Sequence, residues 1–185
     1  DMIGELNIYS CYSFQNSTIL IKDLCKRAHD LHLEAIALTD INNMYGAVEF
    51  SNECHKYGIK PIFGMQGDVL IDQEVYPFLF YAKDQIGYHD LMKICSDINL
   101  SEHKAIELER LSLYREHLFI LSGCKEGIVE RLVLKELESE ALKYIALFKK
   151  MFKDNYYICI QDHHLKMQSF LNERLKALAT LQEVK

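Results

Sequence analysis

Along the 185 residues, segments whose hydrophobic and polar positions have the pattern of a strand alternate with segments that have the period of a helix. Short apolar runs typical of buried strands are separated by amphipathic stretches with helical spacing. Strands are predicted over 5–9, 34–39, 60–63, 117–122 and 156–161, and a hairpin joins 67–71 to 76–82 through a turn at 72–74. Helices are predicted over 19–33, 47–58, 84–97 and 165–183, with two more between 125 and 153; 98–116 is a polar connection with a short helical piece.

This alternation predicts an α/β fold, with no linker or internal repeat to divide the chain. Successive β–α units favour parallel pairing with right-handed crossovers, which leaves both a doubly wound sheet and a barrel open. Both architectures place functional residues where strands end. We therefore expect the site among residues 9–10, 39–40, 64–67, 122–124 and 161–164.

Composition and charge narrow the class of protein. Hydrophobic residues make up 49% and charged residues 26%, which is typical of a globular domain. The net charge of −6, with no run of basic residues, disfavours direct nucleic-acid binding. No apolar stretch is long enough to span a membrane, and six scattered cysteines without a C-x-x-C pair indicate reduced thiols. A soluble, cytoplasmic protein is expected.

Six stretches together resemble the polymerase and histidinol phosphatase (PHP) domain at the N-terminus of the bacterial DNA polymerase III alpha subunit. In the family's order and with similar spacing, they are LNIYSCYSFQNS (6–17), ALTDINNMYGAVEF (37–50), GIKPIFGMQGDV (58–69), YAKDQIGYHDLMKI (81–94), LSGCKEGIVERLV (121–133) and YYICIQDHHLKMQSFLN (156–172). The resemblance implies a distorted, TIM-like barrel of about seven β/α units with a metal cleft at the strand ends. Because the family's last Asp-x-His pair would lie beyond Lys185, it also implies that residues 1–185 lack the last element or elements and are a fragment of a larger polymerase chain.

In active members of this family the cleft holds divalent metals that activate water against a phosphate ester, which requires imidazole and carboxylate ligands. The resemblance assigns the cleft positions of this chain to Asn7, Tyr9, Asn16, Asp40, Ile41, Gln66, Cys124 and His163. Amides, a phenol and a hydrocarbon replace the family's ligands at five of these positions. Only Cys124 and His163 match, so we expect a vestigial cleft with no bound metal and no catalytic residue.

Other interpretations of these residues remain open. Asp40 suits a helix cap, Cys124 a small buried apolar residue, and His163 with His164 a polar surface loop. A single zinc or manganese near His163, with Asp40, Cys124 and Cys159 as companions, is the alternative. Neither a phosphate-binding glycine loop nor a serine nucleophile motif is found.

The resemblance implies a structural and protein-interaction module in DNA replication. Nucleotidyl transfer would belong to the rest of the polymerase chain, which is the expected partner together with the proofreading exonuclease subunit of some members. Two alternatives remain: a metal-dependent phosphoesterase or 3′–5′ exonuclease with a reduced site, and a stand-alone regulatory binding protein.

Overall fold

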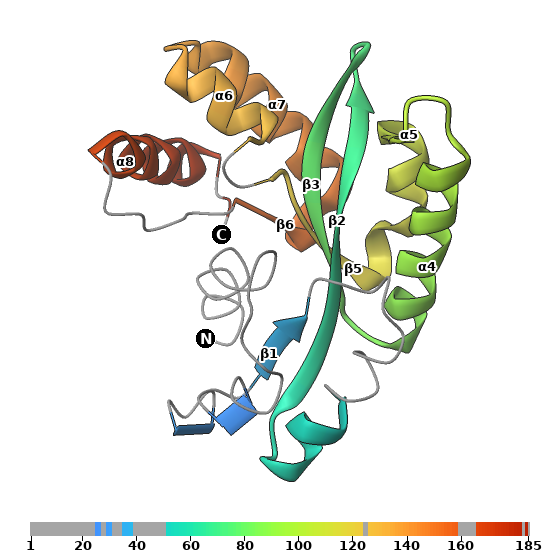
Figure 1. The fold of residues 1–185 in the computed structure, drawn as a ribbon. Coiled ribbons are helices and arrows are strands. Elements are labelled where there is room, and N and C mark those ends of the chain that lie inside the picture. Colours follow the sequence, from blue (N-terminus) through green and yellow to red (C-terminus); the bar gives the residue numbers. More distant parts are fainter. Residues whose placement is uncertain are drawn as a thin grey trace.

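The computed structural model describes residues 25–26, 29–30, 35–38, 51–123, 126–158, 166–182 and 184 (Figure 1). The strands are β1 (Ala35–Leu38), β2 (Lys60–Ile71), β3 (Glu74–Ala82), β4 (Ile106–Glu107), β5 (Leu118–Leu121) and β6 (Tyr156–Tyr157). The helices are α4 (Gln85–Leu100), α5 (Leu108–Leu111), α6 (Ile128–Leu134), α7 (Glu138–Phe152) and α8 (Lys166–Leu181), with 3₁₀ turns η1 (Ser112–His117) and η2 (Lys153–Asn155). The predicted α/β class is therefore confirmed; the strand predicted at 5–9 lies outside the described residues.

The sheet is mixed rather than parallel throughout. Its strand order is β1-β2-β3-β5-β6, with β4 pairing β2. The β1–β2, β2–β4 and β5–β6 pairs are parallel, whereas β3 is antiparallel to both β2 and β5. The antiparallel β2–β3 pair confirms the predicted hairpin, whose short turn cannot make the crossover that a parallel pair needs. The parallel pairing favoured for successive β–α units is found for β1–β2 and β5–β6.

The β2–β3 hairpin runs through the middle of the molecule (Figure 1). The predicted strands 60–63 and 67–71 are one twelve-residue strand, β2, whose last residue Ile71 pairs with Glu74. Asp72 and Gln73 make the turn with φ of 50° and 71°, as a two-residue hairpin of matching twist requires. Tyr144 of α7 donates to Asp72 Oδ2 at 2.6 Å, and this hydrogen bond is the main cause that raises the pKa of Tyr144 to about 12.

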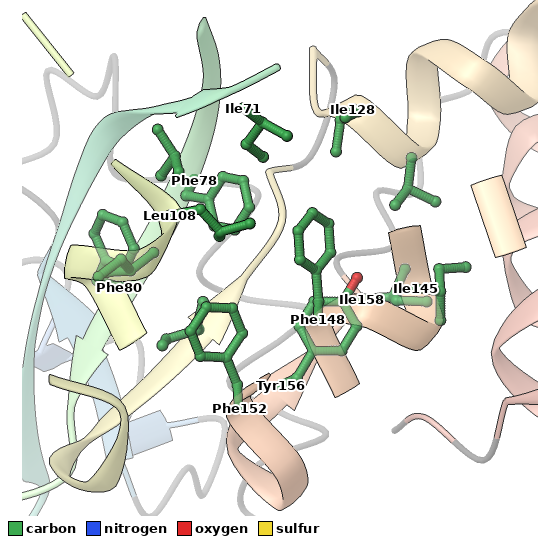
Figure 2. Close-up of a cluster of buried hydrophobic side chains, with 14 of the residues drawn as sticks. Ile71, Phe78, Phe80, Leu108, Ile128, Ile145, Phe148, Phe152, Tyr156 and Ile158 are labelled. Atoms are coloured by element: carbon green, nitrogen blue, oxygen red, sulfur yellow. The ribbon is translucent and has the colours of Figure 1, made fainter. Parts of the chain in front are cut away.

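An aromatic cluster forms the centre of the core, where α7 packs against the sheet (Figure 2). The ring of Phe148 lies 5.4 Å from that of Phe78 in an edge-on arrangement and 5.6 Å from that of Tyr156. Phe80 and Phe152 are buried in the same cluster. Edge-to-face and tilted rings at these separations add to the stabilisation from burial alone.

Helix α4 begins where the sequence predicts and continues three residues further than 97, to Leu100. Asp84 caps it, accepting from the Gly87 backbone N–H at 2.9 Å, while its second oxygen lies 2.8 Å from His117 Nδ1. The Gly87 hydrogen bond, followed by His117, lowers the pKa of Asp84. One side chain therefore fixes both the start of α4 and the entry to β5.

Within the described ranges, none of the helices has the length and apolar character needed to cross a bilayer.

Cys25 and Cys54, which are fully buried, place their thiols 3.8 Å apart without a disulfide. Burial, followed by the proximity of Cys25, raises the pKa of the Cys54 thiol, so this pair behaves as packing rather than as reactive sulfur.

Candidate functional site

Strands β1, β2, β5 and β6 run in the same direction, so their carboxyl ends face the same end of the sheet. The strand register shows which residues lie side by side near these ends. Gln66 of β2 pairs with Leu79 of β3, Leu79 with Leu121 of β5, and Leu121 with Tyr157 of β6. Directly paired residues share a face of the sheet. Gln66 therefore lies level with the last residues of β5 and β6, although its own strand continues to Ile71 and residues 64–67 do not end a strand as expected.

Gln66 is the cleft position that falls within the described residues. Asn7, Tyr9, Asn16, Asp40, Ile41, Cys124 and His163 lie outside them. The Gln66 side chain is exposed, and its neighbours on the same face, Leu79 and Leu121, are buried apolar residues. Over the part of the chain that the structure describes, no three His, Cys, Asp or Glu side chains come close enough to hold a metal.

The chain turns sharply after β5, immediately before Cys124. Gly123 has a φ of 93°, and a side-chain carbon there would lie 2.5 Å from the carbonyl oxygen of Pro77. Only glycine accommodates both the backbone conformation and this close approach to β3. Gly123 therefore lies against the hairpin, and Gly127 is the N-cap residue of α6.

Buried polar side chains occur just after β5, in β6 and in α6. Ser122 Oγ is 2.8 Å from Tyr156 Oη, and neither side chain has appreciable exposure. Glu130 of α6 is 1% exposed, and its carboxyl oxygens have no hydrogen-bond partner among the described residues. Burial raises the pKa of Glu130 well above its usual range and also raises that of Tyr156. Burial therefore favours the uncharged form of both the Glu130 carboxyl and the Tyr156 phenol.

This arrangement has little capacity for hydrolysis. The Ser122 hydroxyl contacts a phenol that retains its proton, so it lacks the base that would make it a nucleophile. Burial disfavours the charged form of Glu130, which is the form that would balance the charge of a metal or accept a proton from water. At the level of Gln66, the described neighbours Leu79 and Leu121 are buried and apolar, and Ser122 follows them.

Glu130 was not predicted from the sequence. Its neighbours Ile128, Val129 and Val133 are apolar and occupy the same helix, so a lone acid among them was a usable signal of a buried carboxyl. The missing information was that α6 turns this position inward. A side-chain carbon at Gly127 would collide with the Glu130 carboxyl, so a glycine provides the space that the acid occupies.

The fold of this chain is similar to that of a solved structure, and its sequence matches a known domain family. A crystal structure from Bifidobacterium adolescentis, provisionally assigned as a metal-dependent phosphoesterase, superposes with a TM-score of 0.53 at 10% identity, covering 96% of this chain and 82% of that one. The fold is accordingly a distorted β/α barrel of that type. The PHP domain family matches residues 5–163, and this chain belongs to the PHP domain family.

The curated relatives of this chain include two DNA polymerase III alpha subunits. The DNA polymerase III subunit alpha of Borreliella burgdorferi is 32% identical over 185 residues, and that of Bacillus subtilis is 31% identical over 179 residues. The matches cover 92% and 95% of this chain but 16% of each relative. The chain thus spans about one sixth of the length of these relatives, and it is homologous to one region of them.

Proposed function

We propose that this chain is the N-terminal PHP domain of a replicative DNA polymerase III alpha subunit, and that it acts as a structural and protein-interaction module. Support comes from relatives of that name that match more than nine-tenths of the chain. Polymerisation, the DNA contacts and their acidic residues belong in this proposal to the remainder of the chain. That remainder is the first partner, and the proofreading exonuclease subunit is a second.

The observation that carries the proposal is the position of Gln66. It stands where the family resemblance expects a glutamate, level with the ends of β5 and β6, and it offers a neutral amide. A cluster of divalent cations needs anionic ligands to balance its charge, and an amide is a weak ligand for zinc or manganese. The donor set, with Asn7, Tyr9 and Ile41 at other family positions, does not fit such a cluster.

The packing around this level supports a structural role. Leu79 and Leu121, beside Gln66, are almost fully buried, and Ser122 and Glu130 are buried as well. Side chains that fill space in this way stabilise a fold without a metal to cross-link its strands. A domain kept for its surface needs this rigidity and does not need the cleft.

Metal content and hydrolysis test the loss of the site. The purified full-length chain should retain no zinc or manganese attributable to this domain after dialysis. Hydrolysis of bis-p-nitrophenyl phosphate with added manganese should stay at background and should be the same in His163→Ala. Stoichiometric metal that disappears in His163→Ala, together with manganese-dependent hydrolysis, would instead establish the phosphoesterase alternative.

Removal of residues 1–185 from the polymerase chain tests the structural role. We expect the polymerase activity of the shortened chain to be lost at a lower temperature, because the surface that the domain covers becomes exposed to water. Heat inactivation of primer extension measures this. Equal inactivation temperatures and equal activities for the two chains would contradict the proposal.

A further inference from the structure

A polar pocket lies at the end of the sheet opposite the candidate site. Lys83 follows β3, residues 115–117 precede β5, and residues 153–155 precede β6, so all three segments meet where the parallel strands begin. The pocket has a volume of about 330 Å³, within the range of small-molecule sites. It is lined by Lys83, Arg115, Glu116, Phe152, Lys153, Asp154 and Asn155.

Three cationic and two acidic side chains line this pocket, so cations are in excess in its lining. Within the described residues, none of the ion pairs involves Lys83, Arg115 or Lys153. Lys83 Nζ donates to Asn155 Oδ1 at 3.0 Å, and Asn155 Nδ2 donates to the backbone oxygen of Arg115 at 2.8 Å. Asn155 thus joins the segments of Lys83 and Arg115, and no acidic side chain takes part in these hydrogen bonds. Lys83 Nζ also lies 5.2 Å from the centre of the Phe119 ring, and Arg115 Nη1 donates to the Ser112 backbone oxygen at 3.2 Å.

Lys153 has a backbone conformation that disfavours any side chain. Its φ of 52° and ψ of −130° belong to a region that glycine adopts readily and other residues avoid. The chain bears this strain at the residue that ends α7 and brings a third cation to the pocket. A glycine would suit this backbone conformation better than lysine does, so Lys153→Gly removes the charge without adding strain.

We propose that this pocket binds a small phosphate ester, with the phosphate held by Lys83, Arg115 and Lys153. Lysine supplies point charges and arginine a planar fork, the combination that phosphate recognition uses. Glu116 and Asp154 line the same pocket and accept hydrogen bonds from hydroxyl groups on the organic part of the ligand. The mixed lining therefore selects a phosphorylated polyol over a bare anion or a highly charged polymer.

Hydrogen–deuterium exchange of the full-length chain, read by mass spectrometry, tests this with ribose 5-phosphate, inorganic phosphate and ribose as probes. Ribose 5-phosphate should slow exchange in peptides covering 112–118 and 151–157, inorganic phosphate should do so only at higher concentration, and ribose should have no effect. Arg115→Gln and Lys153→Gly should each raise the concentration of ribose 5-phosphate that gives half-maximal protection by about tenfold, the effect of one charged hydrogen bond.

Lys104→Gly is the matched control, because Lys104 also has a positive φ of 53° and lies outside the pocket. It should leave the protection by ribose 5-phosphate unchanged. Lys153→Gly should melt no lower than the unmodified chain, since glycine relieves the strain, and this separates lost binding from lost folding. The proposal is overturned if ribose 5-phosphate protects neither segment, or if ribose protects them equally.

Discussion

Glu130 links the stability of this chain to pH through a single carboxyl group. Its burial raises the pKa in the folded state above the value of an exposed glutamate in the unfolded chain. Between these two pKa values the folded state binds the additional proton, so the free energy of unfolding falls as pH rises. Stability from this residue is fully present below the unfolded pKa and is lost progressively above it.

Glu130→Gln should remove this dependence, because the amide has nearly the same shape and carries no titrating group. We expect the variant to gain stability relative to the unmodified chain as pH rises, by up to roughly 1.4 kcal/mol per pH unit. Urea unfolding between pH 5 and pH 8 measures the difference. Glu126→Gln, at an exposed acid four residues earlier, should show no such trend; parallel curves for Glu130→Gln would mean that the carboxyl is already ionised.

Two glycines in the turns of this fold allow the cost of backbone strain to be separated from the cost of a steric clash. Gly58 and Gly123 both have positive φ, of 67° and 93°. A side-chain carbon at Gly58 would meet nothing within 4 Å, whereas one at Gly123 would press on Pro77. The two positions thus share the backbone requirement and differ in the available space.

Gly58→Ala should therefore cost about 1 kcal/mol of unfolding free energy, from backbone strain alone. Gly123→Ala should cost about 3 kcal/mol or more, because β5 and the hairpin must also move apart. Chemical denaturation of both variants measures the two values. Equal losses would show that the turn after β5 is not held against Pro77.

Element prediction succeeded where local patterns decide the structure and failed where pairing does. The helix predicted over 84–97 begins within one residue of α4, and the helix predicted over 47–58 ends before Gly58. The break predicted between residues 63 and 67 is absent, because Gly64 and Gly67 pair across to Tyr81 and Phe78. Glycine weakens a strand locally, but a long hairpin partner maintains its extended conformation.

At the scale of the whole molecule, the proposed function implies that the core of this domain supports the polymerase activity of the remainder of the chain. Phe148 is fully buried at the centre of the aromatic cluster, whereas its neighbour Leu147 is 38% exposed. Phe148→Ala should destabilise the domain by about 3–5 kcal/mol, and Leu147→Ala by less than about 1 kcal/mol. We expect only the former to lower the temperature at which the full-length chain loses primer extension.

The measurement is the heat inactivation of polymerase activity in the two full-length variants, with domain unfolding followed by limited proteolysis. If Phe148→Ala renders residues 1–185 sensitive to protease while primer extension survives to the same temperature, the domain does not support the polymerase. The adjacent pair controls for position in the sequence and for the effect of truncation to alanine in the same helix.

The sequence by itself determined the α/β class, the positions of the principal helices and the family, because these depend on periodicity, caps and motifs read along the chain. It also predicted a neutral amide at Gln66. Only the tertiary structure decided that Gln66 is level with the ends of β5 and β6, that Glu130 turns inward, and that Lys83, Arg115 and Lys153 meet in one pocket. These relations join residues far apart in the chain, and strand register and helix packing set them.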